Sequence, residues 1–118
     1  MGKAFTLEEV EEIREKLLHA GEIIFVEKGL RKANIKDFTN AVGISTGSFY
    51  NFFENKEALL IELMDKYNYE IFEDQKRMIQ RQIEENNFNF EELVMMTFMA
   101  YKNKAVYMMV FEKNDEYE

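Results

Sequence analysis

The sequence contains no cysteine, no proline and a single histidine, His19. Without cysteine the chain can form neither disulfides nor thiolate metal sites, and it offers no cysteine nucleophile, which fits a reducing cytosol. A lone histidine lacks the second imidazole that a histidine-based zinc site needs, so we interpret His19 as an ordinary packed or surface residue. We therefore predict that the protein holds no metal and no other cofactor.

Long apolar runs are missing as well. No stretch comes near the ~20 apolar residues that a membrane-spanning helix requires, and the opening residues MGKAFTLEEVEE lack the apolar segment of a signal peptide. The sequence thus predicts a cytoplasmic protein that does not engage membranes. It also lacks a Gly-rich phosphate loop and a nucleophile motif. Carboxylate pairs such as Glu8 and Glu9 fall on predicted helix surfaces without a positioned partner, so we predict no enzymatic activity.

The residues that are present favour a folded, all-α protein. Hydrophobic residues make up 47% of the chain and charged residues 32%, which provides enough apolar material for a core and argues against disorder. A length of 118 residues accommodates one compact domain, or a small domain with an incomplete second one attached.

The net charge of −8 is unusual for a nucleic-acid-binding protein, but it is unevenly distributed. Residues 1–60 carry eight Lys and Arg against ten Asp and Glu, whereas residues 61–118 carry seven against thirteen. Within residues 30–56 the balance reverses. The basic residues there are Arg31, Lys32, Lys36 and Lys56, and the acidic ones are Asp37 and Glu54. A locally basic segment is what phosphate contact requires, although we favour simple solvated charge for Arg31 and Lys32.

The first helix is indicated by its capping residues. Thr6 followed by Glu9 forms a capping-box pattern, and Gly29 is suited to the left-handed conformation that ends a helix, so we predict a helix over residues 7–28. Apolar or small residues recur along one face of it at steps of three and four. They are Val10, Ile13, Leu17, Ala20 and Ile24.

Further helices follow along the chain. We predict two short helices over residues 35–41 and 46–52, a long helix from residue 56 to the pair Asn86 and Asn87, and helices over residues 90–101 and around 106–111, with a frayed tail at 112–118. Their expected caps are Asn34, Ser45, Asn55 and Asn89. The long helix has apolar positions at Leu59, Leu63, Tyr67, Ile71, Met78 and Ile83. The helix over 90–101 is so apolar that it should need cover on most sides.

Residues 35–54, IKDFTNAVGISTGSFYNFFE, fit a helix-turn-helix unit. Two short helices that cross steeply need apolar residues facing the core, a residue that permits a sharp turn, and an apolar plug behind it. The chain supplies these as Phe38, Val42, Gly43, Ile44, Phe49 and Phe52. The outward positions of the second helix are then Ser45, Thr46, Gly47, Ser48, Tyr50 and Asn51. Such residues let a helix sit deep in a DNA major groove, where amides and hydroxyls read base edges or contact phosphate.

The stretch EIIFVEKGLRKANIKDFTNAVGISTGSFYNFFENKEALL resembles the signature of the tetracycline-repressor (TetR) family of bacterial transcriptional regulators. The similarity consists of an aromatic residue and a glycine closing the first helix, a Gly-aliphatic-Ser turn, a glycine and then a tyrosine in the recognition helix, and a lysine opening the fourth helix. It implies a three-helix, homeodomain-like helix-turn-helix domain at residues 1–54. Residues 55–118 would then be a connecting helix and an incomplete effector-binding and dimerisation domain. Thr39 and Phe38 replace the usual alanine and isoleucine, which predicts a slightly swollen contact between the short helices.

The resemblance also implies roles for individual residues. Tyr50 and Lys56 match positions that contact phosphate, and Lys36 matches a position that often meets the DNA backbone. The positions that choose the base sequence correspond to Thr46, Ser48 and Asn51. Gly47 would allow close approach of the DNA, and Ser45 begins this surface. As alternatives, Tyr50 could pack at the edge of the domain and Lys56 could be a solvated first-turn residue.

A TetR-like protein is expected to bind a pseudo-palindromic operator in double-stranded DNA as a dimer, as a repressor that a small-molecule effector releases. The Met and Phe residues of 88–111 either line an effector pocket or form ordinary core, and we favour core packing for each of them. The apolar helices from Phe90 onward lack their usual cover, so we predict self-association through the C-terminal half. The competing hypothesis is a helical protein-interaction module on the same scaffold that binds no operator.

Overall fold

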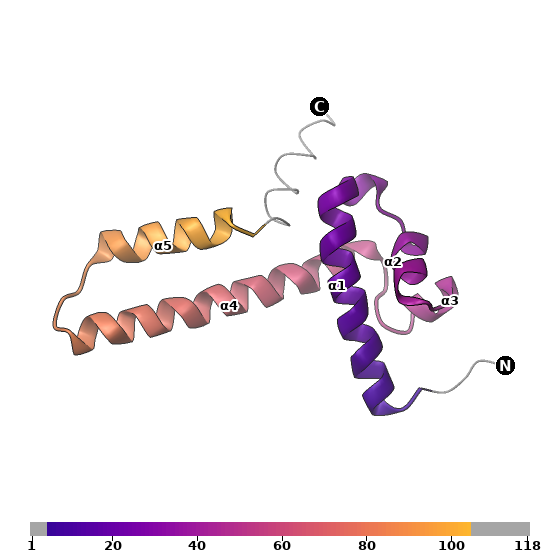
Figure 1. Ribbon diagram of the computed structural model, residues 1–118, viewed down its shortest axis with the longest axis horizontal. Helices are drawn as coiled ribbons and strands as arrows, with labels where there is room; N and C mark the ends of the chain where they lie inside the picture. The colour runs from indigo at the N-terminus through magenta and orange to yellow at the C-terminus, as the bar shows by residue number, and fades with distance from the viewer. Residues whose placement is uncertain (1–4, 105–118) are drawn as a thin grey trace.

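The structure is a computed structural model that describes residues 5–104, and this part of the chain is all-α (Figure 1). Its helices are α1 (Leu7–Lys32), α2 (Ile35–Val42), α3 (Thr46–Phe49), α4 (Lys56–Glu84) and α5 (Phe90–Lys102). The predicted fold class and order of helices are confirmed for these residues. The predicted helix around residues 106–111 and the charged tail lie outside the described residues.

Side-chain caps explain where the helices begin. The Thr6 Oγ1 atom accepts a hydrogen bond from the Glu9 backbone N–H at 3.1 Å, as predicted. The cap of α2 is reciprocal, because Asp37 in turn accepts a hydrogen bond from the backbone N–H of Asn34 at 3.0 Å. The other three caps are Ser45, Asn55 and Asn89. Each satisfies a backbone donor that has no partner within its own helix, so these starts follow from local sequence.

Two glycines with positive φ angles redirect the chain. At Gly29, with φ 78°, the regular part of α1 stops as predicted, and one further turn then carries the helix to Lys32. At Gly43, with φ 84°, α2 ends and the Gly43 N–H donates to the Thr39 carbonyl at 2.8 Å. Residues with a Cβ atom rarely adopt a positive φ angle, which explains glycine at both turns; in the left-handed α conformation of Gly43 the cost would be about 1–2 kcal/mol.

Helix α3, the predicted recognition helix, is shorter than the sequence indicated. The sequence indicated a helix over residues 46–52, but regular α-helix covers only Thr46–Phe49. The next three amides, those of Tyr50, Asn51 and Phe52, donate to carbonyls three residues back, which is the tighter 3₁₀ pattern. These turns bring Phe53 into the core, with its ring centroid 5.7 Å from that of Phe49.

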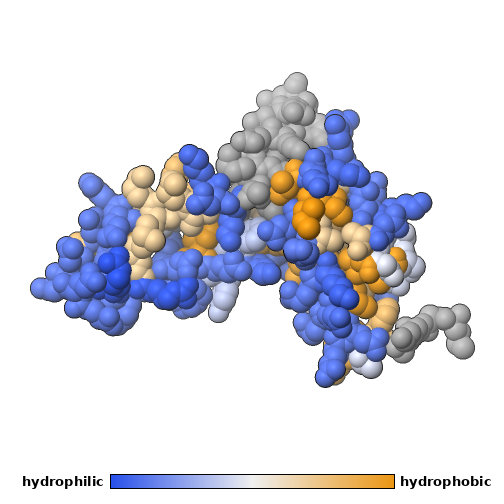
Figure 2. Space-filling model, viewed as in Figure 1, coloured by the Kyte–Doolittle hydropathy of each residue, from blue (hydrophilic) through white to orange (hydrophobic). Residues whose placement is uncertain are grey.

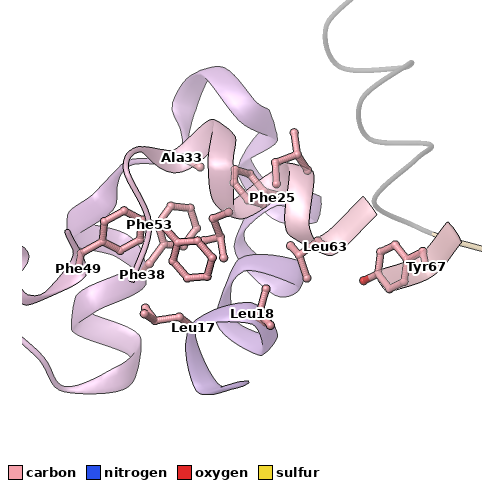
Figure 3. Packing of buried hydrophobic residues seen from close by; sticks show 11 residues of the cluster. Leu17, Leu18, Phe25, Ala33, Phe38, Phe49, Phe53, Leu63 and Tyr67 are labelled. Carbon is pink, nitrogen blue, oxygen red and sulfur yellow. The ribbon is translucent and has the colours of Figure 1, made fainter. Parts of the chain in front are cut away.

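A core rich in phenylalanine holds the first four helices together (Figure 3). Phe25 on α1 lies 5.1 Å from Phe38 on α2, and Phe38 lies 6.2 Å from Phe49 on α3, measured between ring centroids. The other predicted core residues of the helix-turn-helix, Val42, Ile44 and Phe52, are partly buried against this cluster.

Thr39 is buried beside this cluster, where the family pattern prefers alanine. Its hydroxyl donates to the Lys36 carbonyl at 3.3 Å, so the substitution leaves this polar atom with a partner. Phe38, the other departure from the pattern, is fully buried.

The C-terminal part extends away from this core. In Figure 1, α4 leaves the helix-turn-helix and α5 folds back beside it, forming an arm of two antiparallel helices. The Cα radius of gyration is 18.0 Å, whereas a compact domain of about 100 residues would have one of about 13 Å. The arm therefore presents much of its surface to solvent.

One predicted buried position on α4 is wrong. Leu59, Leu63, Tyr67, Ile71 and Met78 are buried as expected, but Ile83 is 62% exposed and its neighbour Gln82 is 1% exposed instead. The Gln82 amide donates to the Asn89 carbonyl at 3.2 Å and accepts from the Asn89 N–H at 3.2 Å. A polar side chain is buried here because it satisfies the backbone of the turn into α5.

The apolar helix α5 has no buried residue within the described part of the chain. Its exposed side chains include Phe90, Val94, Met95, Met96, Phe98 and Met99, and Figure 2 shows hydrophobic surface along this helix. Hydrogen bonds help attach it to α4, among them Gln75 to Thr97 at 2.7 Å and Tyr101 to Asn68 at 3.0 Å. No helix among residues 5–104 is both long and apolar enough to cross a membrane.

Candidate nucleic-acid interface

The surface of α3 and the turns that follow it consists of small polar residues and one tyrosine. Phe49 anchors this segment in the core, while the residues around it face outward. Among the predicted DNA-contacting residues of this segment, Ser48 is half-buried. The five others are exposed: Ser45, Thr46, Gly47, Tyr50 and Asn51. The structure therefore leaves five of these predicted residues accessible on one short segment of the domain. Their roles toward DNA stay predictions.

The hydroxyl groups of Ser45 and Ser48 are partly occupied within the protein. The Ser45 Oγ accepts from the Ser48 N–H at 3.1 Å, and the two Oγ atoms are 2.8 Å apart. Ser45 thus caps α3 in the free protein. Thr46, which lies between the two serines in sequence, and Asn51, which follows them, are both exposed.

Gly47 has no structural need to be glycine. A Cβ atom added there would meet its nearest neighbour, the Ser45 Oγ, at 4.0 Å, and the residue does not have a positive φ angle. At Gly21, by contrast, an added Cβ would lie 3.0 Å from the Leu59 Cδ2 atom. Packing therefore explains Gly21 but not Gly47, whose missing side chain leaves a shallow, open surface at the centre of α3.

Tyr50 rests on the core without being buried in it. Its ring makes an edge contact with Phe49, with centroids 5.8 Å apart, yet the residue is 57% exposed. The alternative that it packs at the edge of the domain is thus correct for one side of the ring, and the remainder of the side chain is available to a partner.

Lys56 is bound to the end of α1. Its ammonium group donates to the carbonyls of Ala33 at 2.8 Å and Arg31 at 3.1 Å. Carbonyls at a helix C-terminus lack intrahelical partners and attract cations, so this contact offsets the cost of a lysine at the start of α4. Sequence reasoning missed this role. An ammonium group has three donors, so a phosphate could be bound only by the third or by displacing a carbonyl.

Near the start of α2, Lys36 is exposed, while the neighbouring Asp37 carboxylate forms an ion pair with Lys28. Asp37 accepts a hydrogen bond from Lys28 at 2.9 Å, and this bond, together with that from the Asn34 N–H, lowers the pKa of the Asp37 carboxyl below its usual 3.8. Because Lys28 offsets the charge of Asp37, the positive charge of Lys36 is not cancelled by its neighbour in sequence.

Arg14 is a residue of this region that the sequence did not single out. Its guanidinium donates from Nη1 to the Phe52 carbonyl at 3.2 Å, pairs with Glu62 on α4, and lies 4.7 Å from the centroid of the Phe53 ring. These partners are between 38 and 48 residues away in sequence, so no local spacing could have indicated them.

The arm contains a cavity of about 340 Å³ between α4 and α5. Its walls include apolar side chains from both helices together with the guanidinium-bearing residues Arg77 and Arg81. Within residues 5–104, no group of three or more His, Cys, Asp or Glu side chains is arranged to hold a metal ion.

Residues 17–63, which include α2, α3 and the start of α4, match the family model described as bacterial regulatory proteins, tetR family. The chain carries a TetR-family N-terminal domain. The resemblance inferred from the Gly-Ile-Ser turn and the recognition-helix tyrosine is therefore confirmed, as is the helix-turn-helix interpretation of this segment.

The curated relatives are similar to this chain over the same part of the sequence. The chain is 34% identical over 59 residues to the HTH-type transcriptional repressor KstR2 of Rhodococcus jostii, covering 50% of this chain and 29% of that protein. It is 34% identical over 73 residues to the HTH-type transcriptional repressor DhaR of a Mycobacterium species, covering 62% and 35%. It thus spans about a third of the length of these curated relatives. No solved structure was found to match the chain.

Proposed function

We propose that this TetR-family chain is a sequence-specific DNA-binding regulator of transcription, acting as a repressor, with no enzymatic activity of its own. The observation that carries the proposal is the exposed surface of α3, where small polar residues surround a glycine that no packing contact requires. A recognition helix needs such a surface to approach the floor of the major groove. KstR2 and DhaR, which share this segment, are named as transcriptional repressors.

In the proposed complex, α3 lies in the major groove. Thr46, Ser48 and Asn51 would read base edges, since hydroxyls and amides can donate to or accept from them. Tyr50 and Lys36 would contact phosphates on either side, fixing the orientation of the helix without selecting a sequence. Lys56 would add a phosphate contact through its remaining donor. Ser45 would act at the rim, where its hydroxyl also holds the α3 cap.

We further propose that residues 1–54 form the DNA-binding domain and residues 55–118 belong to an effector-binding and dimerisation domain. Self-association through the exposed apolar surface of α5 would bring two recognition helices together on a pseudo-palindromic operator. A small-molecule effector would bind in the arm and change their spacing; the 340 Å³ cavity between α4 and α5 is of a size suited to a small ligand. We place the protein in the cytoplasm, where its DNA target would lie.

Duplex selection from a random pool, using the full chain as bait, tests the proposed DNA binding. An enriched sequence would then be compared with a scrambled duplex of equal length by fluorescence anisotropy at several salt concentrations, where affinity for both should fall with salt. If no sequence is enriched over the pool, or if binding is independent of salt, the protein-interaction alternative is favoured and operator binding is rejected.

Matched tyrosine variants test the site itself. Tyr50→Phe keeps the ring contact with Phe49 and removes only the hydroxyl, so it should weaken binding to selected and scrambled duplexes alike, by about 1 kcal/mol for one lost phosphate hydrogen bond. Tyr69→Phe on α4, where the tyrosine is 66% exposed, is the control and should bind as the wild type does. Asn51→Ala should instead relax the preference at one base pair by about 1–3 kcal/mol. Equal behaviour of the two Tyr→Phe variants would contradict the assignment of Tyr50.

A further inference from the structure

Arg14 connects three parts of the chain through polar contacts: α1, the turns after α3, and α4. It starts from α1, its Nη1 donates to the Phe52 carbonyl after α3 at 3.2 Å, and its Nη2 bonds to Glu62 on α4. Its guanidinium also lies against the face of Phe53, 4.7 Å from the ring centroid. A planar guanidinium can make all these contacts at once, whereas the single ammonium of lysine cannot reproduce this fork.

Arg14 and Glu62 are partly withdrawn from solvent and pair with each other. The Arg14 and Glu62 side chains are each 33% exposed, and the second Glu62 carboxylate oxygen is buried with no hydrogen-bond partner among the described residues. The Arg14 charge therefore compensates a carboxylate that is partly removed from water. If Arg14 were replaced by an uncharged residue, the Glu62 carboxylate would lose its compensating charge and would favour a different side-chain position.

Helix α3 depends on such outside support. It has only four residues of α-helix, continued by 3₁₀ turns through Phe52, and helices this short are not stable by themselves. Phe49 and Phe53 anchor this segment in the core, and the Phe52 carbonyl between them needs a hydrogen-bond donor. The Arg14 side chain is what the structure places on that carbonyl.

We propose that Arg14 is a positioning residue that fixes the end of the recognition helix relative to α4 through the Phe52 carbonyl and the Glu62 carboxylate. This inference rests on the proposed function. Through this link, a change in the position of α4 is passed to the base-reading residues of α3, which makes Arg14 a determinant of binding specificity although it touches no DNA.

The test compares Arg14→Gln and Arg14→Lys with Lys16→Gln. Lys16 is exposed on the same helix, where it pairs with Glu12, so its replacement removes the same charge without touching α3. The probes are the duplex selected by the wild-type chain and a scrambled duplex of equal length. Both Arg14 variants should lose about tenfold in the ratio of selected to scrambled affinity, within the usual range of coupling between sites. Lys16→Gln should weaken both duplexes equally and keep the ratio.

Hydrogen–deuterium exchange gives a readout that does not involve DNA. The amides of residues 50–53 should exchange faster in both Arg14 variants, and Lys16→Gln should match the wild type. If Arg14→Gln does not fold, Arg14→Lys decides, since it retains the charge and a single-point contact with Glu62. A preserved affinity ratio or unchanged exchange in folded Arg14→Lys overturns the proposal. Failure of the wild-type chain to select any duplex would instead refute the proposed function, and the specificity role of Arg14 with it.

Discussion

Replacing Gly47 with alanine should separate the needs of the fold from the needs of DNA binding. The added Cβ atom would meet only the Ser45 Oγ, at 4.0 Å, and the backbone of Gly47 does not have a positive φ angle. With neither clash nor strain, the substitution reduces the conformational freedom of the unfolded chain and favours helix. We expect it to stabilise the protein by about 0.5–1 kcal/mol.

The same methyl group would stand at the centre of the surface that we propose approaches DNA. We therefore expect Gly47→Ala to raise the melting temperature by about 2–8 °C, from about 4–8 °C per kcal/mol for a domain of this size, while weakening the selected duplex by about tenfold or more. Differential scanning calorimetry and fluorescence anisotropy measure the two effects. Opposite signs for stability and affinity are the signature of a residue kept for function.

Gly21→Ala provides the inverse control. Its Cβ atom would lie 3.0 Å from the Leu59 Cδ2 atom and 3.3 Å from the Leu63 Cδ1 atom, at the contact between α1 and α4. Overpacking of this kind costs about 1–3 kcal/mol, while the surface of α3 is unchanged. If Gly47→Ala instead lowered stability, or if it bound the selected duplex as well as the wild type, the argument that Gly47 serves DNA approach would be wrong.

Three further perturbations probe contacts seen in the structure. Lys56→Gln, which weakens the bonds to the carbonyls at the end of α1, should lower the free energy of unfolding by about 1–2 kcal/mol in urea titrations, even without DNA; unchanged stability would show that this cap contributes nothing. The pKa of Asp37 is lowered, chiefly because Lys28 donates a hydrogen bond to it. The contribution of Asp37 to stability is therefore present above its unfolded pKa near 3.8 and is lost as the pH falls through its folded pKa. In Asp37→Asn the urea midpoint should fall less steeply between pH 5 and 3 than in the wild type, and an equally steep fall would contradict the assignment. Gln82→Ala removes the acceptor of the Asn89 N–H and one of the two donors to the Asn89 carbonyl, at a cost of about 1–3 kcal/mol. It should speed amide exchange at the start of α5, whereas exchange as slow as in the wild type would argue against this role.

Local chemistry made much of the fold predictable from sequence. Helix starts at Thr6 and Asn34 depend on side chains that bond to amides a few residues away, so the spacing alone identifies them. The turn at Gly43 is predictable for the same reason, since a left-handed residue is needed where it stands. The apolar spacing of Phe38 and Phe49 likewise predicts which sides of the two short helices face the core.

The parts that sequence did not predict depend on contacts between distant segments. The Arg14 guanidinium bonds to Phe52 and Glu62, which lie 38 and 48 positions further along the chain, and neither spacing has a recognisable pattern. Ile83 fitted the apolar periodicity of α4, but the backbone at the turn needed hydrogen bonds, and Gln82 takes the buried position. The length of α3 was overestimated because the entry of Phe53 into the core requires tighter turns than a regular helix makes.

The continuity of α4 has a mechanical consequence. Its 29 residues run without a break, so the helix is about 43 Å long at the usual rise per residue. Lys56 and Glu62 tie its first turns to α1, and the opposite end lies beyond the helix-turn-helix. A rotation of only about 5° at the tethered end would displace the far end by about 4 Å over that length. A ligand or a second subunit that binds the distal part of the arm would therefore change the orientation of the proposed DNA-binding surface through a small rotation of α4.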